Sequence, residues 1–193
     1  MIQTKQDIRL FLKFDILRNR DLKGKKMWLE FLKGNIQTYK KFQFIKALRY
    51  FEFCKNNQNS LWGKIRYSLM KRRFQRLQMQ TQLYISPNVF DKGLNIEHLG
   101  FVRADTIATI GENCTILPRV LLGKKNPSVP LRSISIGKNC YLGTGCTILG
   151  PCTIGNNVVI AAGAVVIRDI PNNCMVAGNP ASIKKTNISP IVE

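Results

Sequence analysis

The chain has 193 residues, of which 45% are hydrophobic, and this content predicts a globular protein with a buried core. It lacks any run of 18 uncharged apolar residues, which excludes a membrane-spanning helix. The net charge of +19 is uneven, because residues 1–82 hold 20 Lys or Arg and 5 Asp or Glu, whereas residues 83–193 hold 10 and 6. We therefore expect two parts, a basic part at 1–82 and a second part at 83–193.

The first part, residues 1–82, is expected to be helical. Apolar residues recur at helical spacing in QDIRLFLKFDILRN, KKFQFIKALRYFEFCKN and SLWGKIRYSLMKRRFQRLQ. The segments DLKGKK and KNNQNS separate these helices, and Ser60 is the expected N-cap of the third. The first residues lack the apolar core of a secretory signal, so we expect the protein in the cytoplasm.

The basic charge of this part permits contact with nucleic acid, an anionic lipid surface or an acidic substrate. A solvated face of lysine-rich helices is an equally good interpretation. The basic residues are dispersed among apolar ones, and no nucleic-acid-binding motif is visible, so nucleic acid is not an expected partner.

In the second part a period of six replaces the helical spacing. Large aliphatic residues recur at this interval, and a small residue follows most of them after four positions. The aliphatic series is Ile110, Ile116 and Leu122, then Ile136, Leu142, Ile148, Ile154, Ile160 and Val166.

A period of six predicts a triangular coil. A chain that turns about 120° every six residues closes in about eighteen, and stacked coils lie ~4.8 Å apart. The large aliphatics fill the interior, and the second inward position must be small. Cys114, Cys140, Cys146 and Cys152 are therefore expected to be small core residues. Glycine is frequent at the second position of the hexad, where we expect it to relieve the corners by adopting positive φ.

The repeat is interrupted once. Leu122 and Ile136 are fourteen residues apart, so GKKNPSVPLRS is expected to project from the scaffold, as functional loops commonly do. The repeat ends near RDIPNNCMVAGNPASIKK, where Pro171 and Pro180 interrupt the strands. Because the chain has no C-x-x-C pair and a single histidine, we expect no metal site.

The hexads followed by IPNNCMVAGNPASIKK resemble the hexapeptide-repeat, left-handed β-helix acetyltransferases over residues 83–193. AGNPA with a following lysine is typical of acetyl-CoA users. PNVFDKGLNIEHLG resembles the segment that carries the catalytic histidine in the serine acetyltransferase branch. The resemblance implies an α+β fold, with an N-terminal helical region followed by a left-handed parallel β-helix with a projecting loop. It also implies a homotrimer that binds acetyl-CoA between neighbouring prisms, without a metal.

The resemblance assigns roles to individual residues. His98, the only histidine of the chain, falls on the catalytic position, where it would remove the proton of the acceptor hydroxyl. Glu97 falls where the serine enzymes carry an aspartate that helps bind the amino acid, and Arg132 falls on an arginine that helps bind the serine carboxylate. Tyr84 stands where those enzymes have the aspartate that orients the histidine, and Ser133 where they have a second histidine. Both departures weaken serine as the acceptor.

The resemblance also implies where acetyl-CoA lies. Thr144, Gly145 and Ala162 would line its pantetheine arm, and Lys184 and Lys185 would approach its phosphates.

We therefore expect an acetyl-CoA-dependent O-acetyltransferase that acts on a sugar hydroxyl, free or lipid-linked, in capsule, exopolysaccharide or lipopolysaccharide synthesis. Serine O-acetylation for cysteine synthesis and N-acetylation of an amino sugar remain open, as does a non-catalytic β-helix scaffold. The basic helical part is expected to contact an anionic membrane surface from the cytoplasm, with about 1 kcal/mol from each nearby Lys or Arg.

Overall fold

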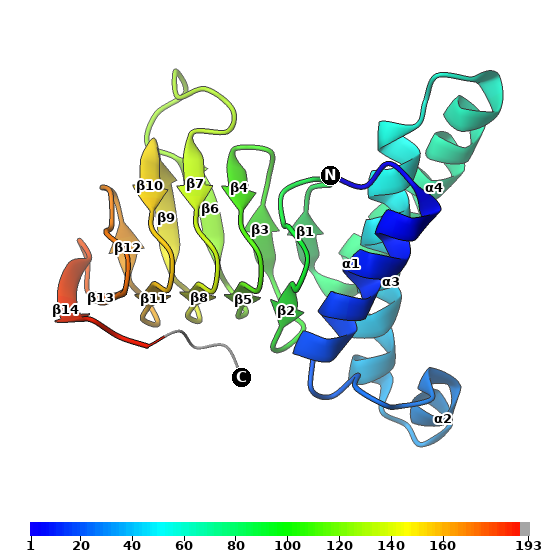
Figure 1. Ribbon diagram of the computed structural model, residues 1–193, viewed down its shortest axis with the longest axis horizontal. Helices are drawn as coiled ribbons and strands as arrows, with labels where there is room; N and C mark the ends of the chain where they lie inside the picture. The colour runs from blue at the N-terminus through cyan, green and yellow to red at the C-terminus, as the bar shows by residue number, and fades with distance from the viewer. Residues whose placement is uncertain (190–193) are drawn as a thin grey trace.

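The computed structural model describes residues 1–189, with helices at one end and a prism of short strands extending to one side of them (Figure 1). The helices are α1 (Lys5–Arg18), α2 (Met27–Leu32), α3 (Ile36–Asn56) and α4 (Leu61–Thr81). The predicted fold class, helices followed by a parallel β-helix, is confirmed. Residues 1–189 contain no helix long and apolar enough to cross a membrane.

Side-chain hydrogen bonds cap the starts of α1 and α4. Thr4 and Asp7 form a capping box at the start of α1. Ser60 caps α4 as predicted, because its hydroxyl accepts a hydrogen bond from the amide of Gly63 at 3.0 Å. The sequence analysis missed α2, whose six residues are too short to show helical periodicity.

The strands form three sheets, one on each face of the prism. The first holds β1 (Leu83–Ile85), β3 (Val102–Ala104), β6 (Leu121–Lys124), β9 (Thr147–Gly150) and β12 (Val165–Val166). The second holds β4 (Ala108–Ile110), β7 (Ile134–Ile136) and β10 (Cys152–Ile154). The third holds β2 (Asn95–Ile96), β5 (Thr115–Ile116), β8 (Tyr141–Leu142), β11 (Val159–Ile160), β13 (Cys174–Ala177) and β14 (Ser182–Thr186).

The stacking register confirms a coil of eighteen residues. Thr147 pairs with Val165, and Tyr141 pairs with Val159, in parallel ladders. The aliphatic residues of the hexads are buried at 0–3% exposure, so they fill the interior as predicted. All six cysteines are buried and free. Burial raises the pKa of Cys146 to about 12 and that of Cys152 to about 11, which keeps both thiols protonated and unreactive at neutral pH.

The prediction for the hexad glycines is wrong. Gly111, Gly137, Gly143 and Gly155 do not adopt positive φ. They permit close stacking instead: a Cβ on Gly137 would lie 2.7 Å from the backbone oxygen of Gly155.

Asparagines occupy the left-handed conformation at one corner of the prism. Asn113, Asn139, Asn157 and Asn173 have φ between 56° and 59°. Their side-chain amides form a ladder, with Asn139 donating to Asn157 at 3.0 Å and Asn157 to Asn173 at 2.7 Å. The positive φ that a corner requires is therefore supplied by a residue that also hydrogen-bonds the next coil.

The interruption of the repeat does project from the prism. Leu121 pairs with Thr147 across 26 residues rather than eighteen, and the segment between β6 and β7 extends away from the coils (Figure 1). At the far end the chain reverses near Pro180, and β14 pairs antiparallel with β13.

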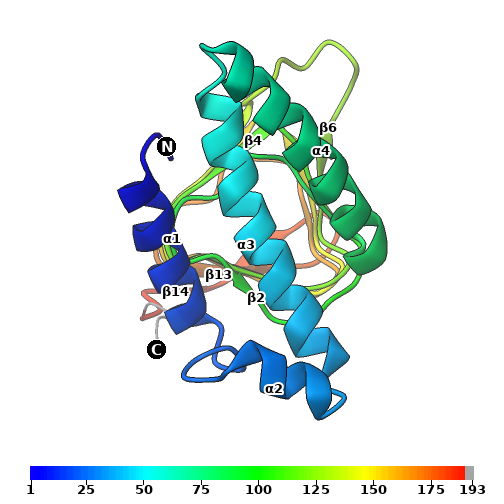
Figure 2. The ribbon, with the colours of Figure 1, turned by 90° about the vertical axis from the view of Figure 1, so that its right-hand side faces the viewer.

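The helices cover the open end of the prism and share its core (Figure 2). α4 ends at Thr81 and β1 begins at Leu83, close to the boundary expected from charge. Phe44, Leu48 and Phe74 belong to the same buried cluster as the prism interior. The two parts therefore differ in secondary structure but not in their hydrophobic core.

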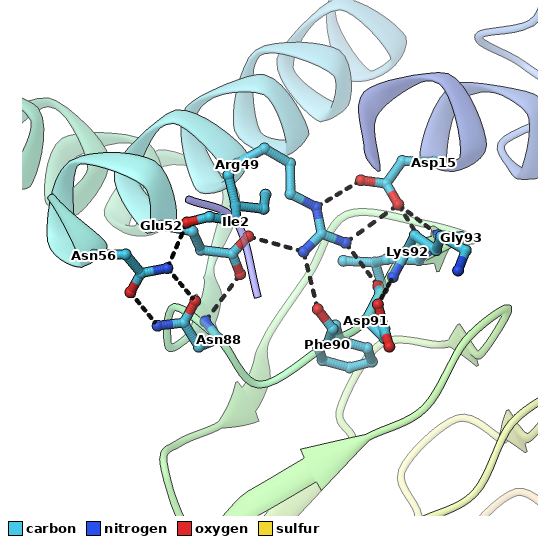
Figure 3. A network of polar contacts seen from close by, with 11 residues as sticks. Ile2, Asp15, Arg49, Glu52, Asn56, Asn88, Phe90, Asp91, Lys92 and Gly93 are labelled. Carbon is cyan, nitrogen blue, oxygen red and sulfur yellow. Dashed lines mark hydrogen bonds and ion pairs between the residues drawn. The ribbon is translucent and has the colours of Figure 1, made fainter. Parts of the chain in front are cut away.

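A buried polar network joins α1 and α3 to the first coil (Figure 3). Arg49 binds Asp15 at 2.7 Å and Glu52 at 2.9 Å, and it also donates to the carbonyls of Phe90 and Asp91. Asp15 in turn accepts from the amides at 93 and 94, at 2.8 and 2.9 Å. The network satisfies backbone groups of the first coil that have no preceding coil to pair with.

Candidate active site

His98 lies on an enlarged corner of the prism. Ile96 and Ala104 flank this corner and are eight positions apart, whereas Ile116 and Leu122, which flank the same corner of the next coil, are six positions apart. Glu97 and His98, at the start of this longer corner, are both exposed to solvent. Within residues 1–189 of one protomer, the imidazole has no hydrogen-bond partner.

His98 borders a cavity of about 500 Å³ between the helices and the third sheet. The outward side chains of three stacked strands, Asn95, Thr115 and Tyr141, form one side of this cavity. The end of α1, the segment after it and the start of α3 form the opposite side. The residues from that side are Arg18, Arg20, Asp21, Gln37, Thr38 and Lys41.

Charges of both signs meet in this cavity. The Glu97 carboxylate accepts a hydrogen bond from Asn95 at 3.0 Å. Burial, with a smaller contribution from the Glu97 charge, raises the pKa of Tyr141 above its ordinary value. Arg18 donates to the carbonyl of Asn113 and to the hydroxyl of Thr115, both at 3.4 Å. The lining of the cavity therefore combines an imidazole with carboxylates and basic side chains, which suits a polar ligand.

Lys41 connects the helices to the histidine segment. Its ammonium donates to the carbonyl of Ile96 at 2.9 Å and lies 3.5 Å from that of Glu97. Asp21 binds the same ammonium at 2.6 Å, and Lys41 is only 4% exposed. Lys41 thus holds the two residues that immediately precede His98.

Lys41 and Asp21 were not predicted from the sequence. They are at least 55 residues from Glu97 and His98 in the chain, so no local motif could include them. One signal was available: Lys41, Ile45 and Leu48 follow the spacing of the buried face of α3. A lysine at such a position needs a buried partner.

The residues expected to line the pantetheine arm lie on the same edge of the prism as His98. Thr144 and Gly145 turn the corner between β8 and β9, and Ala162 turns the corresponding corner one coil later. The amide of Gly145 donates to the carbonyl of Pro118, and that of Gly163 donates to the carbonyl of Thr144, so successive corners are stacked. With coils ~4.8 Å apart, Thr144 lies ~10 Å along this edge from His98.

The remaining predicted residues lie elsewhere in the protomer. Lys184 and Lys185 are exposed on β14. Tyr84 faces outward from β1, where its ring lies 6.0 Å from that of Phe101, and it borders another cavity. Arg132 borders cavities on the side of Asn88 and Thr106. One protomer therefore brings Glu97 and His98 together, but not Tyr84 or Arg132.

Comparison with known proteins agrees with this architecture. Residues 133–168 match the family model "Bacterial transferase hexapeptide (six repeats)". A crystal structure of serine acetyltransferase in complex with coenzyme A from Brucella abortus superimposes with a TM-score of 0.73 and 25% identity, covering 96% of this chain and 71% of that one. Fold and family model define the chain as a hexapeptide-repeat protein.

The sequence relatives include serine acetyltransferases and a galactoside O-acetyltransferase. Serine acetyltransferase 4 of Arabidopsis thaliana is 41% identical over 93 residues, which cover 48% of this chain and 26% of the relative. Galactoside O-acetyltransferase of Escherichia coli is 34% identical over 116 residues, covering 50% of this chain and 57% of the relative. The chain therefore contains a hexapeptide-repeat region and is similar to serine acetyltransferases, and it spans only part of the length of these relatives.

Proposed function

We propose that the protein is an acetyl-CoA-dependent O-acetyltransferase with His98 as the general base. The observation that carries this proposal is the position of His98, at the mouth of a polar cavity and on the edge that carries Thr144, Gly145 and Ala162. A ligand in the cavity and a pantetheine arm along that edge would meet at the imidazole. Lys184 and Lys185 would lie near the phosphates at the far end.

The reaction needs one proton transfer and one displacement. The acceptor oxygen attacks the thioester carbonyl carbon while His98 takes the hydroxyl proton. The C–S bond then breaks, the acetyl group stays on the acceptor oxygen, and the coenzyme A sulfur leaves with the proton from the imidazole. Direct attack requires no acyl-enzyme. No group of three or more His, Cys, Asp or Glu able to hold a metal ion occurs in the part of the chain that the structure describes.

Serine is the first acceptor to test, because the Arabidopsis and Brucella proteins that the chain resembles are serine acetyltransferases. Glu97 would then bind the amino group. This preference replaces the sugar acceptor that the sequence analysis favoured, since the sequence matches support serine better.

A sugar remains the second candidate, and three observations favour it. The cavity of about 500 Å³ falls in the ~300–1,000 Å³ range of pockets for drug-sized ligands, far more than serine requires. By the resemblance, Tyr84 and Ser133 would stand where the serine enzymes have the aspartate and the second histidine. The galactoside O-acetyltransferase of Escherichia coli is also among the relatives.

The proposal is tested by coenzyme A release from acetyl-CoA with L-serine and with a panel of sugars and amino sugars. We expect release with one acceptor class, and His98→Ala should lower kcat by about 10²–10⁴-fold without changing the circular dichroism spectrum. Lys46→Met, on the exposed side of α3, is the matched control and should be as active as the wild type. Full turnover of His98→Ala would refute the mechanism. Release with none of the acceptors would favour a non-catalytic scaffold.

We further propose a homotrimer with sites between protomers. Phe101 and Ile167 flank β3 and β12 of the first sheet, and they are 43% and 39% exposed, which suits a surface covered by another protomer. A neighbour could also bring Arg132 to the His98 corner, which one protomer does not do. Light scattering should give three times the chain mass, and a monomer would contradict shared sites.

Peripheral membrane contact also remains a proposal, now confined to α4. Its outward side carries exposed apolar residues in the first half and arginines in the second, and the helix contains no acidic residue. At 100° per residue these side chains lie within about 120° of one another, as in helices that lie on membranes. They are Leu61, Trp62, Ile65, Leu69, Arg72, Arg73 and Arg76. Sedimentation with vesicles that does not depend on anionic lipid would remove this proposal.

A further inference from the structure

Strand β2, which leads to His98, is the edge strand of the third sheet. The order of that sheet is β14-β13-β11-β8-β5-β2, so β2 pairs with β5 on one side only. On that side the amides of Asn95 and Glu97 donate to the carbonyls of Cys114 and Ile116. The carbonyls of Leu94 and Ile96 and the amide of Ile96 point to the other side, where an edge strand would have no partner.

Helical side chains take the place of the missing strand. The amide nitrogen of Asn19 donates to the carbonyl of Leu94 at 2.8 Å, and the amide of Ile96 donates to the Asn19 oxygen at 3.1 Å. Lys41 completes this set with its hydrogen bond to the Ile96 carbonyl at 2.9 Å. Asn19 is fully buried and Lys41 nearly so, which gives both a fixed geometry.

Lys41 is the member of this set closest to the histidine. Its contacts are the carbonyls of residues 96 and 97, and the next residue is His98. Beyond this point the chain enters the corner that is two residues longer than its counterparts. A longer corner has more conformational freedom. The backbone at its start must therefore be fixed if the imidazole of His98 is to keep one position.

We propose that Lys41 is a positioning residue for His98. The ammonium fixes the Ile96 and Glu97 carbonyls, Asp21 holds the ammonium, and the imidazole is thereby aimed at the cavity. This inference rests on the proposed function for its catalytic consequence. A general base displaced by about 1 Å can lose about 10²-fold in rate, so a contact two residues away has a measurable effect.

The kinetic test compares Lys41→Met with Lys46→Met, which alters an exposed lysine on the same helix. We expect Lys41→Met to lower kcat by roughly 10- to 100-fold with little change in the KM for acetyl-CoA, and Lys46→Met to change neither. Combined with His98→Ala, Lys41→Met should cause no further loss, because it acts through the imidazole. A second loss of the same size in that background, or a change confined to the acceptor KM, would overturn the proposal.

A spectroscopic test separates this proposal from the proposed function. Because His98 is the only histidine, its imidazole gives a single set of NMR resonances that can be observed whether or not the protein turns over. Lys41→Met should shift and broaden these resonances, and Lys46→Met should leave them unchanged. Unchanged resonances in Lys41→Met would overturn the positioning role, even in an active enzyme. Shifted resonances in a protein without turnover would support that role and count against the acetyltransferase.

Asp21→Asn is a second variant in case Lys41→Met does not fold. It keeps the lysine and its hydrogen bond but removes the counter-ion, which is 37% exposed and so tolerates replacement. We expect the same direction of change in kcat and in the imidazole resonances, with a smaller size. Wild-type behaviour in both would count against the proposal.

Discussion

Arg49 offers the sharpest test of how the helices hold the first coil. Its side chain has no exposed surface, binds the carboxylates of Asp15 and Glu52, and donates to two carbonyls of the first coil. Burial opposes its charge, but Glu52 and Asp15 outweigh that effect and raise the pKa of Arg49 above its ordinary value. The guanidinium is therefore charged at every accessible pH.

Replacing Arg49 with Met should cost about 5 kcal/mol of unfolding free energy. Removing one partner of a buried ion pair costs ~3–5 kcal/mol, because the remaining charge is left without compensation. Arg49→Met leaves two such carboxylates, Asp15 at 0% and Glu52 at 1% exposure, and the two losses are not additive because they share one cation. A loss of this size is comparable to the ~5–15 kcal/mol total stability of a typical domain.

The assay is urea unfolding followed by far-UV circular dichroism at one protein concentration, since oligomers unfold in a concentration-dependent manner. Lys46→Met should change stability by less than ~0.5 kcal/mol. The triple variant Asp15→Asn, Arg49→Met, Glu52→Gln removes all three charges, and it should recover at least ~1 kcal/mol relative to Arg49→Met alone. If the triple variant is no more stable than Arg49→Met, uncompensated charge is not the cause. Should Arg49→Met not fold, Glu52→Gln is measured instead, with an expected loss of ~1.5–3 kcal/mol.

Two further predictions concern the prism. Gly137→Ala should destabilise by ~1–3 kcal/mol in urea unfolding, because its Cβ would lie 2.7 Å from a backbone oxygen of the next coil. Gly123→Ala, whose Cβ would meet only the side chain of Leu149 at 3.4 Å, should be nearly neutral, and equal losses would contradict the stacking explanation. Cys146 should resist iodoacetamide in the native protein at pH 8, because burial raises its pKa to about 12. Mass spectrometry would follow the labelling. If Cys146 reacts as fast in the native protein as in urea, the coil opens in solution.

The period of six was sufficient to predict the prism, because its inward positions alternate with outward ones at a fixed interval. The projecting segment was visible as a break in that interval. The conformation of the glycines was not predictable in the same way. A glycine selected for positive φ and one selected for close stacking look alike in sequence, and only the neighbouring coil tells them apart.

The candidate site likewise contains residues that could be predicted from the sequence and residues that could not. Glu97 and His98 are adjacent in sequence and could be found together. The cavity beside them is completed by Asp21 and Lys41, which belong to the helical part and reach His98 only through the packing of α3 against the first coil. The charge pattern predicted either a binding surface or a solvated face, whereas burial of Arg49, Glu52 and Lys41 shows that several charges of α3 face inward.

Closure of the third sheet at both ends has a consequence for the length of the molecule. Asn19 and Lys41 occupy one terminal edge, and β14 runs antiparallel along the other, so this sheet offers no free parallel edge to another prism. Parallel coils with open ends would propagate into a fibre. Because both ends are occupied, the number of coils between them can change without altering either terminal structure. Insertion of one more eighteen-residue coil between β8 and β11 would lengthen the edge beyond His98 by ~4.8 Å and leave both terminal structures intact.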